Sequence, residues 1–231
     1  MIPKANGKKR PLGIPSMRDR LIQQMFKQVL EPVAEAKFFK HSYGFRPLRK
    51  TQDAITRCMT LINRSKLHYV VDIDIEGFFD NVNHNLLKKQ LWNIGIHDKR
   101  VLAIISKMLK APIKGIGVPT KGTPQGGILS PLLSNIVLND LDQWVARQYE
   151  LFETEHDYSK VEGKYRALRK TKLKTGFIVR YADDFKVLTD NHKDAYKWYH
   201  AVRLYLKERL KLDISKEKSK VINLRKSSSE F

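Results

Sequence analysis

Two short stretches of the sequence place aspartates between apolar residues, where strands of a sheet are expected. Asp183 and Asp184 adjoin in FIVRYADDFKVL (residues 177–188), and Asp72 and Asp74 lie in VVDIDIEGFFD (residues 70–80). Adjacent carboxylates disfavour one another's charge unless a cation neutralises them, and hard cations such as Mg²⁺ take oxygen ligands. An isolated Asp pair is also common in solvated turns, but the apolar residues on both sides favour a metal site at the edge of a half-buried sheet.

If the two strands are neighbours, Asp74, Asp183 and Asp184 converge at one end of the sheet. Two metal ions ~3.5–4 Å apart can activate an attacking hydroxyl and stabilise a leaving phosphate. The seven histidines show no metal-ligand spacing. The single cysteine, Cys58, excludes internal disulfides and a cysteine zinc cluster, and its apolar spacing predicts burial in a helix. The carboxylates therefore predict phosphoryl-transfer chemistry with Mg²⁺.

The charge of the chain indicates a polyanionic partner. Its 231 residues include 44 Lys and Arg against 24 Asp and Glu, a formal net charge of +20 that is spread along the sequence. Distributed cations of this kind bind nucleic-acid phosphates, although solubility and anionic membrane surfaces are alternative reasons for a basic chain. No apolar run approaches the ~18 residues of a membrane span, and the first residues lack the apolar core of a secretory signal. We therefore expect a cytoplasmic protein without a membrane partner.

Periodicity predicts the elements that must position the aspartates. Residues 2–15 indicate a β-hairpin with Asn6 and Gly7 in its turn, and period-two alternation over residues 70–75 predicts a strand that contains both Asp72 and Asp74. Apolar spacing predicts helices over residues 19–39, 50–63, 84–92, 98–110, 130–149 and 194–210. Residues 177–188 are expected to form two strands, residues 220–224 a last strand, and the charged residues 152–176 a surface insertion. This order favours an α+β fold with a mixed or antiparallel sheet.

Several motifs, taken together and in order, resemble those of the group II intron reverse transcriptases, the intron-encoded maturases. They are IPKANGKKRPLGIP (2–15), YGFRP (43–47), DIEGFFDNVNH (74–84), GTPQGGILSPLLSNIVLNDLD (122–142) and YADDF (181–185). Retron and diversity-generating reverse transcriptases share some of them, but the first motif and the long TPQGGILSPLLSNI favour the group II branch. The resemblance covers nearly the whole chain.

The resemblance implies the fingers and palm of a right-hand polymerase. Residues 1–70 would be mostly fingers, 71–95 palm, 96–121 their junction, and 122–231 palm with a basic insertion at about 152–176. The family continues beyond the segment NLRKSSSEF (223–231) into a thumb. The chain is therefore expected to be a fragment without a thumb, with weak or no activity alone, and the apolar surface that a thumb would cover favours a homodimer.

The resemblance also implies roles for individual acidic residues. Asp74 and Asp183 correspond to the metal-binding aspartates, with the backbone carbonyl of Ile75 as a further ligand. Asp184 would support the site and contact metal less directly. Two Mg²⁺ ions, for which Mn²⁺ can substitute, would be the cofactors. Asp72 lies outside the matching motif and is interpreted as structural.

Five further residues are expected to contact the incoming nucleotide: Lys4, Arg10, Phe79, Gln125 and Lys218. Lys4 and Arg10 would grip the triphosphate, and Lys218 would protonate the leaving pyrophosphate. Phe79 would be the steric gate that excludes a ribose 2′-hydroxyl. The alternatives are a solvated charge for Lys4 or Arg10, a plain loop at Gln125, and a core aromatic for Phe79, as Phe78 is expected to be.

Template or RNA contacts are expected at Arg46, Lys164, Arg166, Arg169 and Lys170, with anchoring of its own loop as the alternative for Arg46. The resemblance thus implies an RNA-directed DNA polymerase. It would extend a DNA primer with deoxynucleoside triphosphates on an intron RNA template. The alternative is a non-catalytic RNA-binding maturase module that stabilises the folded intron RNA for splicing.

Overall fold

The chain forms two compact units. The computed structural model describes residues 2–3, 9–10, 13–113, 115 and 117–226, and of residues 2, 3, 9 and 10 the backbone alone. The first unit comprises residues 1–38, 76–138 and 210–212, and the second, here called the sheet unit, comprises residues 39–75, 139–209 and 213–231. Both units combine segments that are distant in sequence, so their cores depend on tertiary contacts.

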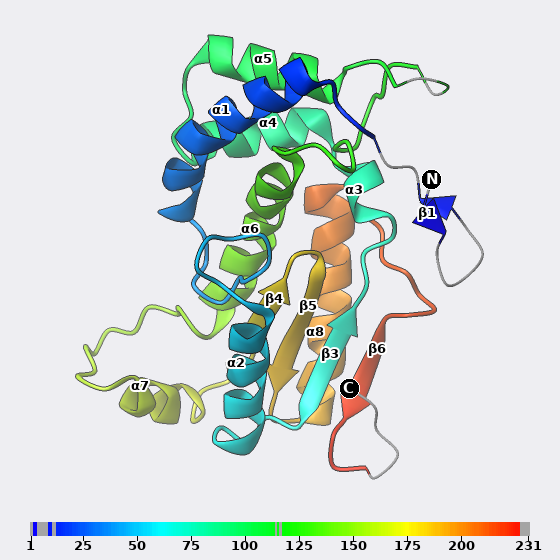
Figure 1. Cartoon of the computed structure of the whole chain (residues 1–231). Coiled ribbons are helices and arrows are strands. Elements are labelled where there is room, and N and C mark those ends of the chain that lie inside the picture. Colours follow the sequence, from blue (N-terminus) through cyan, green and yellow to red (C-terminus); the bar gives the residue numbers. More distant parts are fainter. Residues whose placement is uncertain (1, 4–8, 11–12, 114, 116, 227–231) are drawn as a thin grey trace. The chain divides into compact units, whose positions relative to one another are not determined.

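The sheet unit is built on four antiparallel strands in the order β4, β5, β3, β6 (Figure 1). The strands are β3 (Tyr69–Ile73), β4 (Phe177–Tyr181), β5 (Asp184–Thr189) and β6 (Lys220–Asn223). β4 and β5 form a hairpin, and β3 lies between β5 and β6. Of the two predicted sheet types, the structure therefore shows the antiparallel one.

Helices pack on this sheet and bury the residues that alternate along its strands. α8 (His192–Tyr205), followed by a π-helix (Leu206–Leu210), packs against β3, β5 and β6, and α2 (Thr51–Asn63) packs against β4 (Figure 1). Because successive strand residues point to opposite faces, Val70 and Leu188 share the core on the α2 side with Cys58. The predicted burial of Cys58 in a helix is confirmed.

The first unit is mainly helical. It contains α1 (Met17–Glu35), α3 (Phe78–Asn81), α4 (His84–Asn93) and α5 (Lys99–Leu109), and α6 (Ser130–Gln148) contributes residues to both units. β1 (Ile2–Pro3) pairs with β2 (Lys9–Arg10), which confirms the hairpin, while its expected turn at Asn6 and Gly7 lies outside the described residues. All six predicted helices are present, and the short α3 was not predicted.

The segment 152–176 is not simply a surface insertion, and that prediction needs correction. It contains α7 (Val161–Leu168), in which Leu168 is buried and joins the core of the sheet unit. Tyr165 stacks on Tyr149 and meets Phe177 edge to face, with ring centroids 6.0 and 5.2 Å apart. The sequence pattern missed this anchor because a helix of two turns has too few apolar positions to show a period.

None of the helices in the described ranges is both long and apolar enough to cross a bilayer.

Candidate active site

The strand register brings the predicted carboxylates to one end of the sheet. Tyr181 pairs with Asp184, so Ala182 and Asp183 form the turn between β4 and β5. On the neighbouring strand, Ile73 pairs with Phe185, and Asp74 is the next residue along the chain. The end of β3 therefore lies beside the start of β5, although nearly 110 residues separate the two segments in the sequence.

Lysines accompany two of these carboxylates. Lys186 Nζ lies 2.7 Å from Asp184 Oδ1 and 2.7 Å from Asp72 Oδ1, and thus joins the two acids across the sheet. Burial alone would lower the pKa of Lys186, but the hydrogen bonds to Asp184 and Asp72 outweigh burial and raise it. Lys218 Nζ lies 3.5 Å from Asp74 Oδ2. Asp72, which sequence reasoning interpreted as structural, therefore shares a lysine with a predicted site residue.

The end of β3 is held by the segment that carries Lys218. The Asp74 amide donates to Ser219 Oγ at 3.2 Å, and the Asp74 carbonyl accepts from the Ser215 amide at 2.8 Å. Ile75 is buried and forms an isolated antiparallel bridge with Ile214. These contacts place the Lys218 ammonium beside the Asp74 carboxylate, a proximity that the sequence spacing alone does not indicate.

The oxygen groups at this end of the sheet are suitable ligands for Mg²⁺. Within the described ranges, no three His, Cys, Asp or Glu side chains are grouped so that they could hold a metal ion, so the expected convergence of all three carboxylates is not observed. Mg²⁺ is usually held by one or two protein carboxylates together with substrate phosphates. The Asp74 and Asp184 side chains are 46% and 69% exposed, which leaves carboxylate oxygens accessible for such a shared site.

The buried side chain of Arg180 holds the turn between β4 and β5 in place. Ala182 has a φ of 57°, a left-handed conformation that L-residues adopt at a cost. The Arg180 side chain is 1% exposed and donates to both oxygens of Asp142 in α6, with the shortest contact at 2.6 Å. Its Nη1 also donates to the Ala182 carbonyl at 2.7 Å. Arg180 therefore connects the strained turn to α6 through fixed hydrogen bonds.

The YGFRP segment lies directly against the same turn. The Tyr43 amide donates to the Arg180 carbonyl at 2.8 Å, and the Arg180 amide donates to the His41 carbonyl at 3.0 Å. A Cβ atom on Gly44 would lie 2.1 Å from the Ala182 nitrogen, so only glycine permits this approach. Gly44 lies in the YGFRP motif, but its role could not be predicted, because nothing in the local sequence indicates which backbone it meets.

Arg46 of the same motif has the geometry of the loop-anchoring alternative. The residue is buried, and its Nη1 donates to the carbonyls of Phe39 and Ser42, each at 2.8 Å. A guanidinium committed to two carbonyls of its own loop is not presented to a template. The prediction of a template contact at Arg46 is therefore not supported by its position.

Two of the expected nucleotide residues of the first unit, Phe79 and Gln125, belong to segments that are hydrogen-bonded to each other. The Thr123 amide donates to the Phe79 carbonyl at 2.7 Å, and Gln125 Nε2 donates to Asp80 Oδ1 at 3.1 Å. Phe78 is buried as predicted, whereas Phe79 is only partly buried. Lys4 lies outside the described residues, and of Arg10 only the backbone in β2 is described.

The cations predicted to bind RNA belong to α7 and the residues just after it. Arg166 and Lys170 are exposed. Arg169 is exposed and also donates to the Ser65 carbonyl at 3.2 Å, and Lys164 donates to the Glu150 carbonyl at 3.4 Å. Because Leu168 anchors α7 in the core of the sheet unit, these cations lie on a packed helix or directly after it.

The sequence and the motif geometry agree with one protein family. The family described as "Reverse transcriptase (RNA-dependent DNA polymerase)" matches residues 2–230. The chain belongs to the reverse transcriptase family. The fold of the chain also resembles that of solved telomerases. It aligns with apo telomerase from Candida tropicalis with a TM-score of 0.53 and 17% identity, over 92% of this chain and 41% of the other.

Curated relatives of this reverse transcriptase include proteins encoded by group II introns. The chain is 34% identical to group II intron-encoded protein LtrA of Lactococcus lactis subsp. cremoris, over 94% of its own length and 43% of LtrA. It is also 34% identical to protein YkfC of Escherichia coli (strain K12), over 95% of its length and 61% of YkfC. The reverse transcriptase thus spans less than two thirds of either relative.

Proposed function

We propose that this protein is an RNA-directed DNA polymerase of the group II intron type. It would extend the 3′-hydroxyl of a DNA primer with deoxynucleoside triphosphates on an RNA template. The observation that carries the proposal is the strand register, which brings Asp74 and the Asp183 turn together at one accessible end of the sheet. The family match and the relatives encoded by group II introns support the same reaction.

Four residues at this end of the sheet have a role in this proposal. The carboxylates of Asp74 and Asp183 and the carbonyl of Ile75 would hold divalent metal. Bound Mg²⁺ ions supply activation of the primer hydroxyl and neutralisation of the leaving phosphates. Lys218, whose Nζ lies 3.5 Å from Asp74 Oδ2, would donate a proton to pyrophosphate. The enzyme otherwise contributes alignment and charge neutralisation rather than a protein nucleophile.

Primer extension on an RNA template tests the proposal. Asp183→Ala should abolish incorporation because it removes a metal ligand, while RNA affinity stays the same or rises. Asp157→Ala is the matched control, because this exposed aspartate lies in the segment before α7 and its loss changes the net charge equally. Incorporation by the Asp183 variant at the parent's rate would reject the mechanism.

A second candidate function is RNA binding that assists splicing, in which the RNA itself carries the chemistry. The exposed cations of the anchored α7 segment favour it. The Asp183→Ala protein separates the two functions. An intron RNA that folds and splices with this variant as well as with the parent would assign splicing assistance to the binding surface alone.

A further inference from the structure

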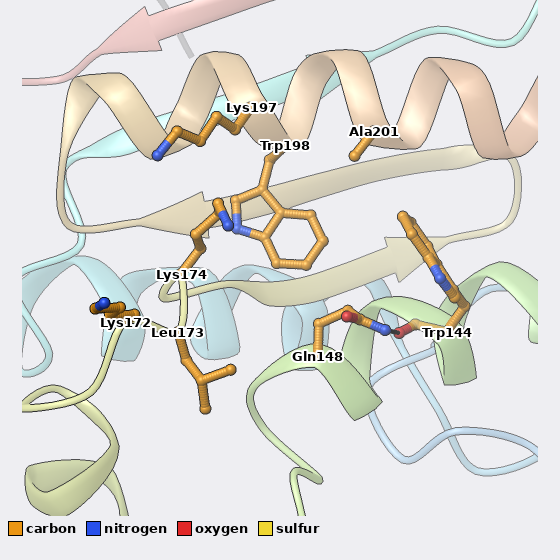
Figure 2. Close-up of a pocket in the computed structure, with 8 residues that line it drawn as sticks. All are labelled: Trp144, Gln148, Lys172, Leu173, Lys174, Lys197, Trp198 and Ala201. Atoms are coloured by element: carbon orange, nitrogen blue, oxygen red, sulfur yellow. Dashed lines mark hydrogen bonds between the residues drawn. The ribbon is translucent and has the colours of Figure 1, made fainter.

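The sheet unit contains an aromatic pocket that the proposed reaction does not use. It has a volume of about 260 Å³ and is lined by Trp144, Gln148, Lys172, Leu173, Lys174, Lys197, Trp198 and Ala201. Figure 2 shows Trp198 projecting from α8 toward the middle of the site, with Trp144 and Gln148 on α6 and the three residues 172–174 on the far side from Trp144. The walls of the pocket therefore come from α6, α8 and the segment that precedes β4.

The aromatic wall of this pocket is fixed by its surroundings. Trp144 stacks on Tyr205, with ring centroids 4.3 Å apart and an interplanar angle of 17°, and Trp198 meets Trp144 edge to face at 6.2 Å. Trp198 is buried, and its Nε1 donates to the Thr175 carbonyl at 2.9 Å. A Cβ atom on Gly176 would lie 2.4 Å from the indole, so glycine is needed for the ring to lie there. Trp144, which is only partly buried, is therefore a preorganised stacking surface at the pocket.

The rim of the pocket is positively charged. Lys172 and Lys174 are exposed, and neither takes part in an ion pair within the described part of the chain. Lys197 pairs with Asp194 at 3.1 Å but remains 44% exposed in its side chain. None of the described lining residues is acidic. Aromatic side chains with three lysine ammonium groups around them suit a ligand that has a flat apolar part and an anionic group.

We propose that this pocket binds one unpaired nucleobase of RNA together with an adjoining phosphate. Its volume is just below the ~300–1,000 Å³ of pockets for drug-sized ligands, which fits a single nucleotide. Unpaired RNA bases are recognised by stacking on aromatic side chains, with phosphates held by Lys and Arg. The choice of RNA as the polyanion rests on the proposed function, whereas the stacking geometry does not.

The pocket is distinct from the carboxylate end of the sheet. Gly176 directly precedes β4, whereas the turn with Asp183 follows β4 at its other end. A base bound between Trp144 and Lys174 is therefore not the nucleotide being added. It would be a base of a bound RNA that lies beyond the reacting end of the primer.

Indole fluorescence of the 231-residue chain can test this inference. Trp92→Phe leaves Trp144 and Trp198 as the two tryptophans that report, since the chain has three. The probes are an adenosine hexanucleotide and the same ribose-phosphate oligomer with abasic positions. The base-containing probe should quench the emission and bind about five- to tenfold more tightly, because each stacked base adds affinity. Equal affinity and equal quenching by both probes would overturn the proposal.

Two sets of variants assign the effect to this pocket. Lys172→Gln/Lys174→Gln should weaken binding of both probes at least threefold more than Lys99→Gln/Lys107→Gln, which removes two exposed lysines of α5. Trp144→Leu, checked for folding by circular dichroism, should remove the preference for bases. A preference that survives Trp144→Leu would overturn the proposal, as would concentration-dependent dimerisation that quenches the emission without RNA.

The test separates this inference from the polymerase proposal. No primer, template or triphosphate is present, and Asp183→Ala should keep the same preference for bases as the parent. A preference for bases in a protein that never extends a primer would reject the polymerase and retain the pocket. Primer extension by a protein without such a preference would reject the pocket proposal and retain the polymerase proposal.

Discussion

The absence of a side chain at Gly44 allows its backbone to lie against Ala182, in the turn that carries Asp183. A Cβ atom at residue 44 would overlap the Ala182 backbone, 2.1 Å from its nitrogen. Gly44→Ala should therefore displace the turn that carries Asp183, and a displacement of 1 Å at reacting groups can cost about 100-fold in rate. We expect primer extension to fall by about this factor while RNA affinity is retained.

Gly163→Ala provides the control for this substitution. Gly163 lies inside α7, where an added Cβ would meet Tyr158 at an ordinary contact distance of 3.4 Å. Alanine favours the helix over glycine, so this variant should be as stable as the parent or slightly more so. Equal extension rates in the Gly44 and Gly163 variants would show that residue 44 does not position the turn.

The two adjacent phenylalanines of α3 should respond differently to substitution. Phe78 is 2% exposed, and Phe78→Ala should lower the free energy of unfolding by about 3–5 kcal/mol. Phe79 is only partly buried, so Phe79→Val should fold and should incorporate ribonucleotides more readily than the parent. Single-nucleotide incorporation with paired ribo- and deoxyribonucleotides measures this. Unchanged sugar discrimination would assign the Phe79 ring to packing alone.

At the scale of elements, the buried carboxylate of Glu150, just after α6, connects α2 to the segment that lies against the turn with Asp183. The Glu150 side chain is 1% exposed and lies 3.1 Å from Lys40, 3.2 Å from His41 and 3.3 Å from Arg57. Removing one partner of a buried ionic group leaves the others uncompensated, at a cost of roughly 3–5 kcal/mol. Glu150→Gln should destabilise the fold by this amount in urea unfolding, whereas the exposed Glu155→Gln should change stability by less than about 0.5 kcal/mol.

The same cluster makes stability depend on pH. Burial lowers the pKa of His41, although its hydrogen bond to Glu150 opposes this, and Arg57 and Lys40 lower it further. Neutral His41 can donate from Nε2 to Glu150 and accept from the Tyr43 hydroxyl at Nδ1, 2.9 Å away. Below its ordinary pKa of about 6.5, the unfolded state binds a proton that the folded state resists.

We therefore expect the free energy of unfolding to decrease as the pH falls from about 7 through the lowered pKa of His41. Burial would raise the pKa of Glu150, but the hydrogen bond from His41 and the neighbouring cations lower it, so protonation of Glu150 at more acidic pH destabilises the fold further. Urea unfolding at pH 7.5 and 5.5 measures the first effect. His41→Gln should flatten the pH dependence in this range, and an unchanged slope would contradict the assignment to His41.

At the scale of the whole molecule, the charge of +20 should dominate RNA affinity. A protein that neutralises six to ten phosphates loses about 10³–10⁵ in affinity between 50 and 200 mM salt. Filter binding or fluorescence anisotropy over this range should show a steep linear decrease of log affinity with log salt. A flat profile would contradict binding dominated by the RNA backbone.

The sequence by itself determined the kinds of elements, the net charge and the family. Helical spacing, strand alternation and the ordered motifs are local patterns, and α2, the β4–β5 hairpin and β6 follow them closely. The burial of individual side chains was less predictable than the secondary structure. The apolar Leu21, Met25 and Val29 of α1 are 57–71% exposed, although their spacing is that of a buried helix face.

Only the tertiary structure decided which of these residues meet. It paired Asp74 with Lys218 and Asp72 with Lys186, and it placed Gly44 against Ala182. Each of these contacts depends on the backbone of a second segment that lies elsewhere in the chain. A sequence pattern records how a residue suits its own helix or strand, whereas distances between elements follow from how their cores pack together.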